Sequence, residues 1–150
     1  MSTPGAQQIL SVENLRAYFH TPRGVVRAID GVDLSLTEGR ALGLVGESGC
    51  GKSVFARTVM GLLPSYAKFG DDSHIKYRGT DLLALPDKAR RALCGPEISM
   101  IFQDPMTSLN PVMRISDQVT EGMRFHLGYT KSAARAKALE LLTEVGIPQP

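Results

Sequence analysis

The chain has 150 residues, of which 43% are hydrophobic and 21% are charged. This composition suits one soluble globular domain with a sizeable core and excludes a disordered chain. A formal net charge of +2, without a long run of lysines or arginines, gives no support for a nucleic-acid-binding surface. No apolar run approaches the roughly 18 residues of a membrane span, and the first ten residues do not resemble a signal peptide. We therefore expect a cytoplasmic chain without a membrane segment.

The first forty residues have the alternating pattern of antiparallel β-structure. Residues 9–20 are strand-like, and the TPRG segment at 21–24 is a turn. A second strand-like segment covers 25–29, and apolar residues alternate with polar ones over 32–36. The pattern predicts a small antiparallel β subdomain over residues 1–40.

The GESGCGKS segment at 46–53 has the spacing of a phosphate-binding loop. A phosphate chain needs several backbone N–H groups directed at it within one turn, and Gly46, Gly49 and Gly51 leave room for such a turn. Lys52 supplies a cation for the β- and γ-phosphates, and Ser53 supplies a hydroxyl for Mg²⁺. The segment therefore predicts a nucleoside triphosphate site.

The residues around this loop predict a strand before it and a helix after it. Residues 41–45 (ALGLV) have the pattern of a short buried strand. Apolar residues recur at helical spacing from Phe55 to Leu62, and Pro64 ends the helix. Such a helix directs its positive N-terminal end at a bound phosphate. This context makes a chance glycine-rich turn the weaker interpretation and indicates an α/β fold.

The second half of the chain begins with alternating strand and helix patterns and continues with helical patterns alone. A short strand contains Ile75 and Tyr77, a helix is expected from Pro86 to Gly95, and residues 98–102 predict a second buried strand. From residue 110 onward the spacing of apolar residues is helical.

The order of these segments resembles the ATP-binding subunit of an ABC transporter. GESGCGKS, the YRGTDLL segment at 77–83 and the ISMIFQDPMTSLNP segment at 98–111 resemble in particular the peptide and nickel importer branch, across nearly the whole chain. The resemblance implies an α/β fold of the ABC-type P-loop NTPases, with an incomplete parallel-sheet core. Its implied parts are an antiparallel β subdomain at about 1–40, a phosphate-loop core with the Q-loop at 41–105, and the start of the helical subdomain at 106–150.

The resemblance also implies a function. The subunit would be an ATPase that energises import of oligopeptides, dipeptides or nickel across the cell membrane, with ATP and Mg²⁺ as cofactors. Its partners would be transmembrane permease subunits, a second ABC ATP-binding subunit and, indirectly, an extracytoplasmic solute-binding protein. It would lie peripherally at the cytoplasmic face of the membrane and would not bind nucleic acid.

Individual residues take roles from the same resemblance. Gln103 matches the Q-loop glutamine, whose amide can contact Mg²⁺ or the attacking water, although a loop glutamine is otherwise usually a solvated residue. Lys52 and Gln103 are thus the predicted catalytic residues, and Ser53 and Gln103 the predicted Mg²⁺ ligands. The predicted nucleotide-binding residues are Phe19, Gly46, Ser48, Gly49, Cys50, Gly51, Lys52, Ser53 and Val54.

Phe19 matches the family's aromatic residue that stacks on adenine. Tyr18 precedes it, and consecutive strand residues face opposite ways, so only one of the two rings can stack on the same base. An aromatic residue on a strand is otherwise more often part of the core. The resemblance favours Phe19 as the stacking residue.

Asp104, the segment Met106–Asn110 and the start of the following helix match the region that touches the membrane subunits in related transporters. Asp104-Pro105 and Asn110-Pro111 are also favourable turn sequences, which explains these residue types without any partner. Contact with a partner is therefore implied by the resemblance alone.

The two cysteines, Cys50 and Cys94, make a poor disulfide pair, because a bridge would pull the phosphate loop away from its ligand. No histidine neighbours Cys50 in the sequence, and the three histidines are scattered without ligand spacing. Cys50 is therefore interpreted as a small loop residue. Alkylation of its thiol should block nucleotide binding, and saturating ATP should protect it.

Family features that complete an ATP site are not found in these 150 residues. The sequence contains no LSGGQ-type signature loop, no Walker B strand with its catalytic glutamate, and no switch histidine. We therefore expect residues 1–150 alone to bind nucleotide without efficient hydrolysis, in a marginally stable fold. Two alternatives remain open: a short nucleotide-binding or interaction module that does not hydrolyse ATP, and a soluble ABC ATPase not linked to transport.

Overall fold

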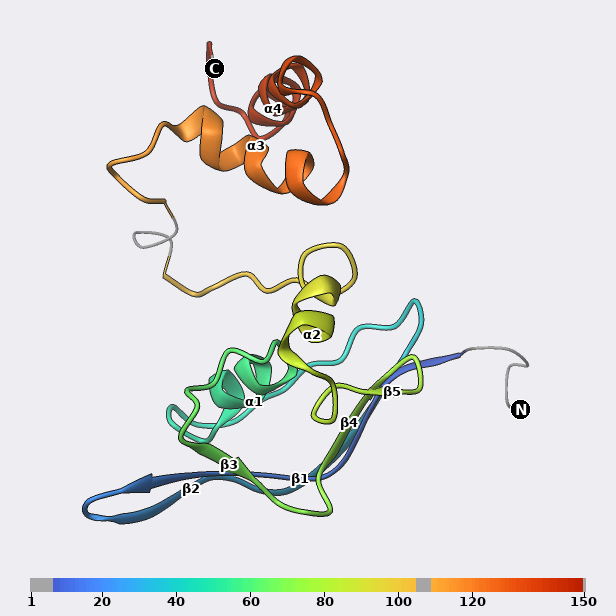
Figure 1. Cartoon of the computed structure of the whole chain (residues 1–150), viewed down its shortest axis with the longest axis vertical. Helices are drawn as coiled ribbons and strands as arrows, with labels where there is room; N and C mark the ends of the chain where they lie inside the picture. The colour runs from blue at the N-terminus through green and yellow to red at the C-terminus, as the bar shows by residue number, and fades with distance from the viewer. Residues whose placement is uncertain (1–6, 105–108, 150) are drawn as a thin grey trace. The chain divides into compact units, whose positions relative to one another are not determined.

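The computed structural model describes residues 7–104 and 109–149, which are coloured in Figure 1. The chain divides into two compact units, residues 1–92 and residues 93–150. The first unit contains the β-structure and the phosphate loop, and the second is helical.

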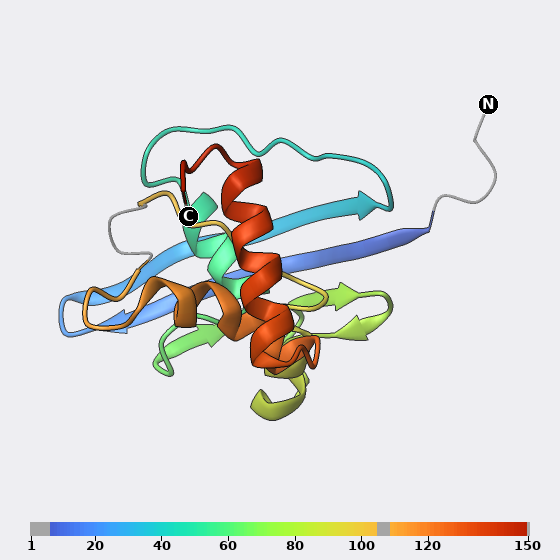
Figure 2. The ribbon, with the colours of Figure 1, turned by 90° about the horizontal axis from the view of Figure 1, so that it is seen from above.

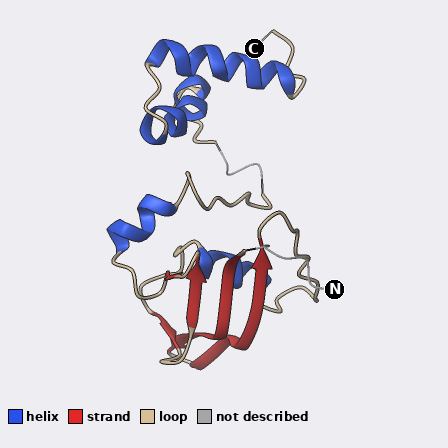
Figure 3. Cartoon of the chain, turned by 90° about the vertical axis from the view of Figure 1, so that its right-hand side faces the viewer, coloured by secondary structure: helices blue, strands red, loops and turns tan. Residues whose placement is uncertain are grey.

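The first unit is built on a long antiparallel hairpin. Its strands are β1 (Gln8–Thr21) and β2 (Gly24–Thr37). Three short strands follow: β3 (Ala67–Phe69), β4 (His74–Tyr77) and β5 (Thr80–Asp81). The order in the sheet is β2-β1-β4-β5, and β3 pairs with the second half of β1; these strands are red in Figure 3. The predicted antiparallel strands and the turn at 21–24 are therefore confirmed.

A bulge in β1 places the main apolar residues on one side of the sheet. Val12 and Leu15 are three positions apart, so strict alternation would direct them to opposite faces. The register with β2 shifts between them, and Asn14 there has a positive φ of 44°. The irregularity lets both side chains be buried, together with Ile75 of β4 and Leu82 after β5.

Two helices complete the first unit. Helix α1 (Lys52–Val59) follows the phosphate loop and contacts β2. Its one fully buried residue is Thr58, whose hydroxyl donates to the Val54 carbonyl at 2.8 Å. Helix α2 (Asp87–Leu93) lies within the predicted range of 86–95.

The second unit is a pair of packed helices, α3 (Ile115–His126) and α4 (Lys131–Glu144), which cross in Figure 2 in orange and red. Thr130 caps α4, because its hydroxyl accepts a hydrogen bond from the Ala133 N–H at 3.2 Å. The buried contact uses Ala134 and Ala138. The predicted helical texture after residue 110 is confirmed. No helix in the described part of the chain is both long and apolar enough to span a membrane.

Two predicted strands are wrong in this structure. Residues 41–45 form no strand, and Val45 is 95% exposed. Residues 98–102 likewise form no strand: Ile98 makes only an isolated bridge to Cys94, and Ile101 is 97% exposed. A strand needs a neighbour to satisfy its backbone N–H and C=O groups, and no strand among the described residues pairs with either segment. The two predicted parallel strands are therefore absent, and residues 41–45 and 99–102 have no regular secondary structure.

Two glycines of the second unit allow a matched test of backbone conformation. Gly122 lies inside α3 with open space around its position, so Gly122→Ala should raise the free energy of unfolding by about 1 kcal/mol. Gly128 has the same open space but a φ of +67°, so Gly128→Ala should lower it by about 1 kcal/mol. Urea unfolding followed by far-UV circular dichroism measures both. Shifts of the same sign would contradict the described backbone of α3 and its C-terminal turn.

Candidate nucleotide-binding site

The phosphate loop is held by glycines in backbone conformations that other residues rarely adopt. Gly49 has a φ of +82° and Gly51 a φ of +95°. A Cβ on Gly51 would also lie 2.5 Å from the carbonyl oxygen of Ala28 on β2, where backbone cannot yield. Glycine is therefore required at position 51 for two independent reasons, and the end of the loop lies directly against β2.

The inside of the loop is occupied by side chains of the loop itself. A Cβ on Gly46 would lie 2.7 Å from Cys50 Sγ and 3.8 Å from Lys52 Nζ. Glycine at position 46 therefore leaves open the space into which these two side chains point. Ser48 is exposed in the loop, and Ser53 is exposed in the first turn of α1.

Lys52 folds back over the loop. Its ammonium donates to the carbonyl oxygens of Gly46 and Glu47, both at 2.7 Å, and to Cys50 Sγ at 3.3 Å. These three contacts match the three donors of a lysine ammonium. The loop therefore concentrates a positive charge beside the N-terminus of α1, as a site for an anion requires.

The same contact alters the chemistry of Cys50. The hydrogen bond from Lys52 is the main cause that lowers the pKa of the Cys50 thiol below its ordinary value. The thiol is exposed, so this change is open to reagents. Cys50 is thus a reporter of where the Lys52 ammonium lies.

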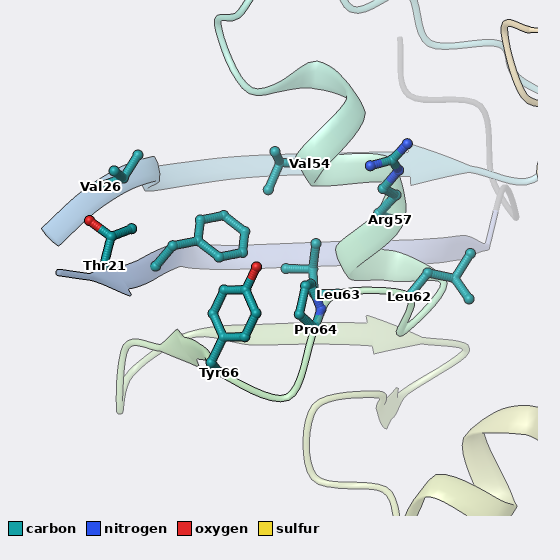
Figure 4. A pocket seen from close by; sticks show the side chains of 9 residues that line it. Thr21, Val26, Val54, Arg57, Leu62, Leu63, Pro64 and Tyr66 are labelled. Atoms are coloured by element: carbon teal, nitrogen blue, oxygen red, sulfur yellow. The ribbon is translucent and has the colours of Figure 1, made fainter. Parts of the chain in front are cut away.

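Phe19 and Val54, which the sequence assigns to nucleotide binding, line one pocket of ≈ 480 Å³. In Figure 4, Val54 and Arg57 extend from α1, Val26 lies on β2, and Tyr66 extends from the segment that follows α1. The pocket is therefore walled by the hairpin, by the helix that begins at the phosphate loop, and by the chain that leaves this helix. Stacking of Phe19 on a base remains a prediction.

Tyr18 contacts charged residues of β2. Its hydroxyl donates to the Asp30 carboxylate on β2, and the Arg27 guanidinium lies 5.7 Å from its ring centroid. The hydrogen bond raises the pKa of Tyr18 and lowers that of Asp30. Of the two neighbouring aromatic residues, Phe19 is thus the one whose ring lines the pocket.

A second cleft of ≈ 210 Å³ lies between β2 and the phosphate loop. Ile29 and Val32 line it from the strand, and Cys50, Lys52 and Phe55 line it from the loop and α1. The phosphate loop therefore faces apolar side chains of β2 across this cleft.

Gln103 lies at an exposed bend of the second unit, whereas Lys52 and Ser53 belong to the first. Its roles in catalysis and Mg²⁺ binding therefore remain predictions. Asn110 forms a turn, since its side-chain oxygen accepts from the Val112 N–H at 3.1 Å. The residues Met106 to Ser108, which the sequence assigned to partner contact, lie outside the described residues.

Two features of the site are not predicted by the sequence. The first is the contact of Lys52 with Cys50, although both residues were assigned to the loop. The second is Tyr66, whose ring lies edge-on to Phe19 with centroids 6.0 Å apart and an interplanar angle of 64°. No motif marks Tyr66, and only the fold brings it to the pocket.

The family model described as ABC transporter matches residues 29–149. The chain belongs to the ABC transporter family. It is 46% identical over 144 residues to the dipeptide transport ATP-binding protein DppD of Bacillus subtilis, covering 96% of this chain and 43% of the relative. It is 43% identical over 150 residues to the peptidoglycan transport ATP-binding protein YejF of Agrobacterium fabrum, covering 100% of this chain and 28% of the relative. The chain thus spans less than half the length of these relatives.

Solved structures of ABC cassettes share the fold. The dimeric structure of the bacterial ABC transporter cassette MJ0796 has a TM-score of 0.75 at 21% identity and covers 89% of this chain and 56% of that chain. A second structure of MJ0796, in a post-hydrolysis state bound to ADP and Pi, has a TM-score of 0.73 at 20% identity and the same coverage. The predicted α/β fold of the ABC type is therefore confirmed.

The pH dependence of Cys50 alkylation tests the contact with Lys52. Because the hydrogen bond lowers the thiol pKa, more thiolate is present at neutral pH, and iodoacetamide should react faster than with an ordinary thiol of pKa about 8.5. Lys52→Ala should move the titration to higher pH and slow labelling at neutral pH severalfold. Mass spectrometry of the labelled peptides follows Cys50, with Cys94 as the internal control. Identical pH profiles for Cys50 in both proteins would show that Lys52 does not contact the thiol in solution.

Proposed function

We propose that this chain binds Mg²⁺·ATP through the loop at 46–53 and belongs to the ATP-binding subunit of an ABC importer. One observation carries the proposal: the Lys52 ammonium lies inside a glycine loop at the start of a helix. Anionic ligands at such a helix start gain from backbone N–H groups and from the helix dipole. Membership of the ABC transporter family supports a nucleotide as the anion.

The residues of the loop fit a triphosphate. Gly46 and Gly51 keep the backbone free of side chains where the loop is tightest, and Lys52 supplies the cation. Ser53, next to Lys52 on α1, would hold Mg²⁺, with Gln103 as a further ligand. When bound, Mg²⁺ neutralises phosphate charge and so supports phosphoryl transfer to water.

Hydrolysis is proposed as the activity of the whole subunit. Lys52 would balance negative charge on the transferred phosphoryl group, and Gln103 would orient the attacking water without adding charge. Phe19 and Val54 would contact the base and the adjoining part of the nucleotide, since both line the same pocket. The remaining loop residues would bind phosphate oxygens mainly through their backbone N–H groups.

The transported solute and the partners are proposed from the relatives. Several are dipeptide or oligopeptide transport ATP-binding proteins, which favours peptides over nickel as the solute. Transmembrane permease subunits and a second ATP-binding subunit would be the direct partners, and an extracytoplasmic solute-binding protein an indirect one. The subunit would lie peripherally at the cytoplasmic face of the membrane.

Nucleotide binding by the purified chain tests the proposal. Lys52→Ala removes the cation at the centre of the loop, and hydrogen bonds from charged groups contribute about 1.5–3 kcal/mol, so ATP affinity should fall by about ten- to a hundredfold. Isothermal titration calorimetry with ATP and Mg²⁺ measures the change. Lys131→Ala, which removes the same charge from an exposed position at the start of α4, should bind as the wild type does. Equal affinity of wild type and Lys52→Ala would overturn the proposed site.

A further inference from the structure

Tyr66 is placed beside Phe19 by strand pairing rather than by a free loop. It immediately precedes β3, in which Ala67 pairs with Phe19 of β1. The Ala67 N–H also donates to the Pro64 carbonyl at 2.9 Å, which closes a turn around Tyr66. Two backbone constraints therefore hold the tyrosine next to the ring that it contacts.

The segment 62–66 is also held at its first residue, where it leaves α1. The Leu62 N–H donates to the Arg57 carbonyl at 2.8 Å, and Gly61 has a φ of +65°, so the chain turns sharply at the end of α1. The residues from 62 to 66 thus bridge α1 and the sheet over a short distance along the chain. A pocket wall built in this way is preorganised for a ligand.

The pocket contains ligand-accessible aromatic surface. Tyr66 lies edge-on to Phe19, with centroids 6.0 Å apart, yet 58% of Tyr66 remains exposed. A ring with this exposure contributes less to the core than a buried one, and it leaves much of its surface free for contact. Figure 4 shows its hydroxyl end directed toward the pocket that Val54 and Arg57 border.

The pocket and the phosphate loop meet on one helix. Val54 lies two residues after Lys52 in the first turns of α1 and lines the pocket. A ligand with phosphates at Lys52 that extends along the first turns of α1 would therefore bring its opposite end to Phe19 and Tyr66. Flat heteroaromatic bases stack readily on aromatic side chains, which suits this combination of rings.

We propose that Tyr66 is a second base-binding residue, which supports the edge of Phe19 and contacts the purine of the bound nucleotide with its own ring. This inference rests on the proposed function, because it places the nucleotide phosphates in the loop at 46–53. It adds a specificity determinant from the chain between α1 and β3.

Comparison of ATP with inorganic tripolyphosphate tests this inference in the purified full chain. Tyr66→Ala should weaken ATP binding about tenfold, because a stacking surface is lost, and should leave tripolyphosphate binding unchanged. Tyr66→Phe keeps the ring and should keep ATP affinity within about twofold of wild type. Isothermal titration calorimetry measures both ligands. In a double-mutant cycle with Phe19→Ala, the two losses should not add, since the rings are in contact.

Phe69→Ala is the matched control, because Phe69 lies on β3, the strand that Tyr66 immediately precedes, and its ring does not line the pocket. It should leave ATP affinity unchanged. The inference is overturned if Tyr66→Ala retains wild-type ATP affinity, if it weakens tripolyphosphate as much as ATP, or if Phe69→Ala causes the same loss. A wild-type chain that binds neither ligand, or a Lys52→Ala variant that binds both normally, would instead refute the proposed function.

Discussion

The close approach of Gly51 to β2 is the contact on which the rest of the site depends. The backbone there leaves no room for a Cβ beside the Ala28 carbonyl, and the Gly51 carbonyl accepts the first helical hydrogen bond of α1 from the Phe55 N–H at 2.8 Å. One residue therefore both ends the phosphate loop and starts the helix against the hairpin. Because α1 is fixed in this way, Lys52 lies on the side of the loop and Val54 on the side of the aromatic pocket.

Local sequence patterns are sufficient to predict most of the helices and strands. They do not predict which distant segments pair with one another. The hairpin, α1 and the helical character of the chain after residue 110 follow from alternation, glycine positions and helical spacing within short windows. The apolar runs at 41–45 and 98–102 have the same local character as strands. They form no strand because a parallel strand is defined by its neighbours, and the described residues supply none. An apolar run thus indicates that a segment is suited to burial in a sheet, without indicating what will cover it.

The same distinction applies to the site. Gly46, Gly51 and Lys52 were identified from spacing, because each has a task within the loop itself. Phe19 is predicted by resemblance alone, because alternation along β1 says only that Phe19 and Tyr18 face opposite ways. Tyr66 carries no such signal, since its place beside Phe19 depends on the pairing of β3 with β1 across nearly fifty residues of sequence.

The hydrogen bonds that Lys52 makes within the loop determine which contacts an anionic ligand must replace. All three donors of its ammonium are used within the loop, on two carbonyl oxygens and one thiol. An anionic ligand gains the charge of Lys52 only by replacing some of these contacts, so its net affinity is the difference between the new hydrogen bonds and the old ones. The hydrogen bond to Cys50 is the longest of the three and the one made to a weak acceptor, so it is the contact that costs least to replace. Once it is replaced, the main cause of the lowered Cys50 pKa is removed, and the thiol reports directly on the movement of the lysine.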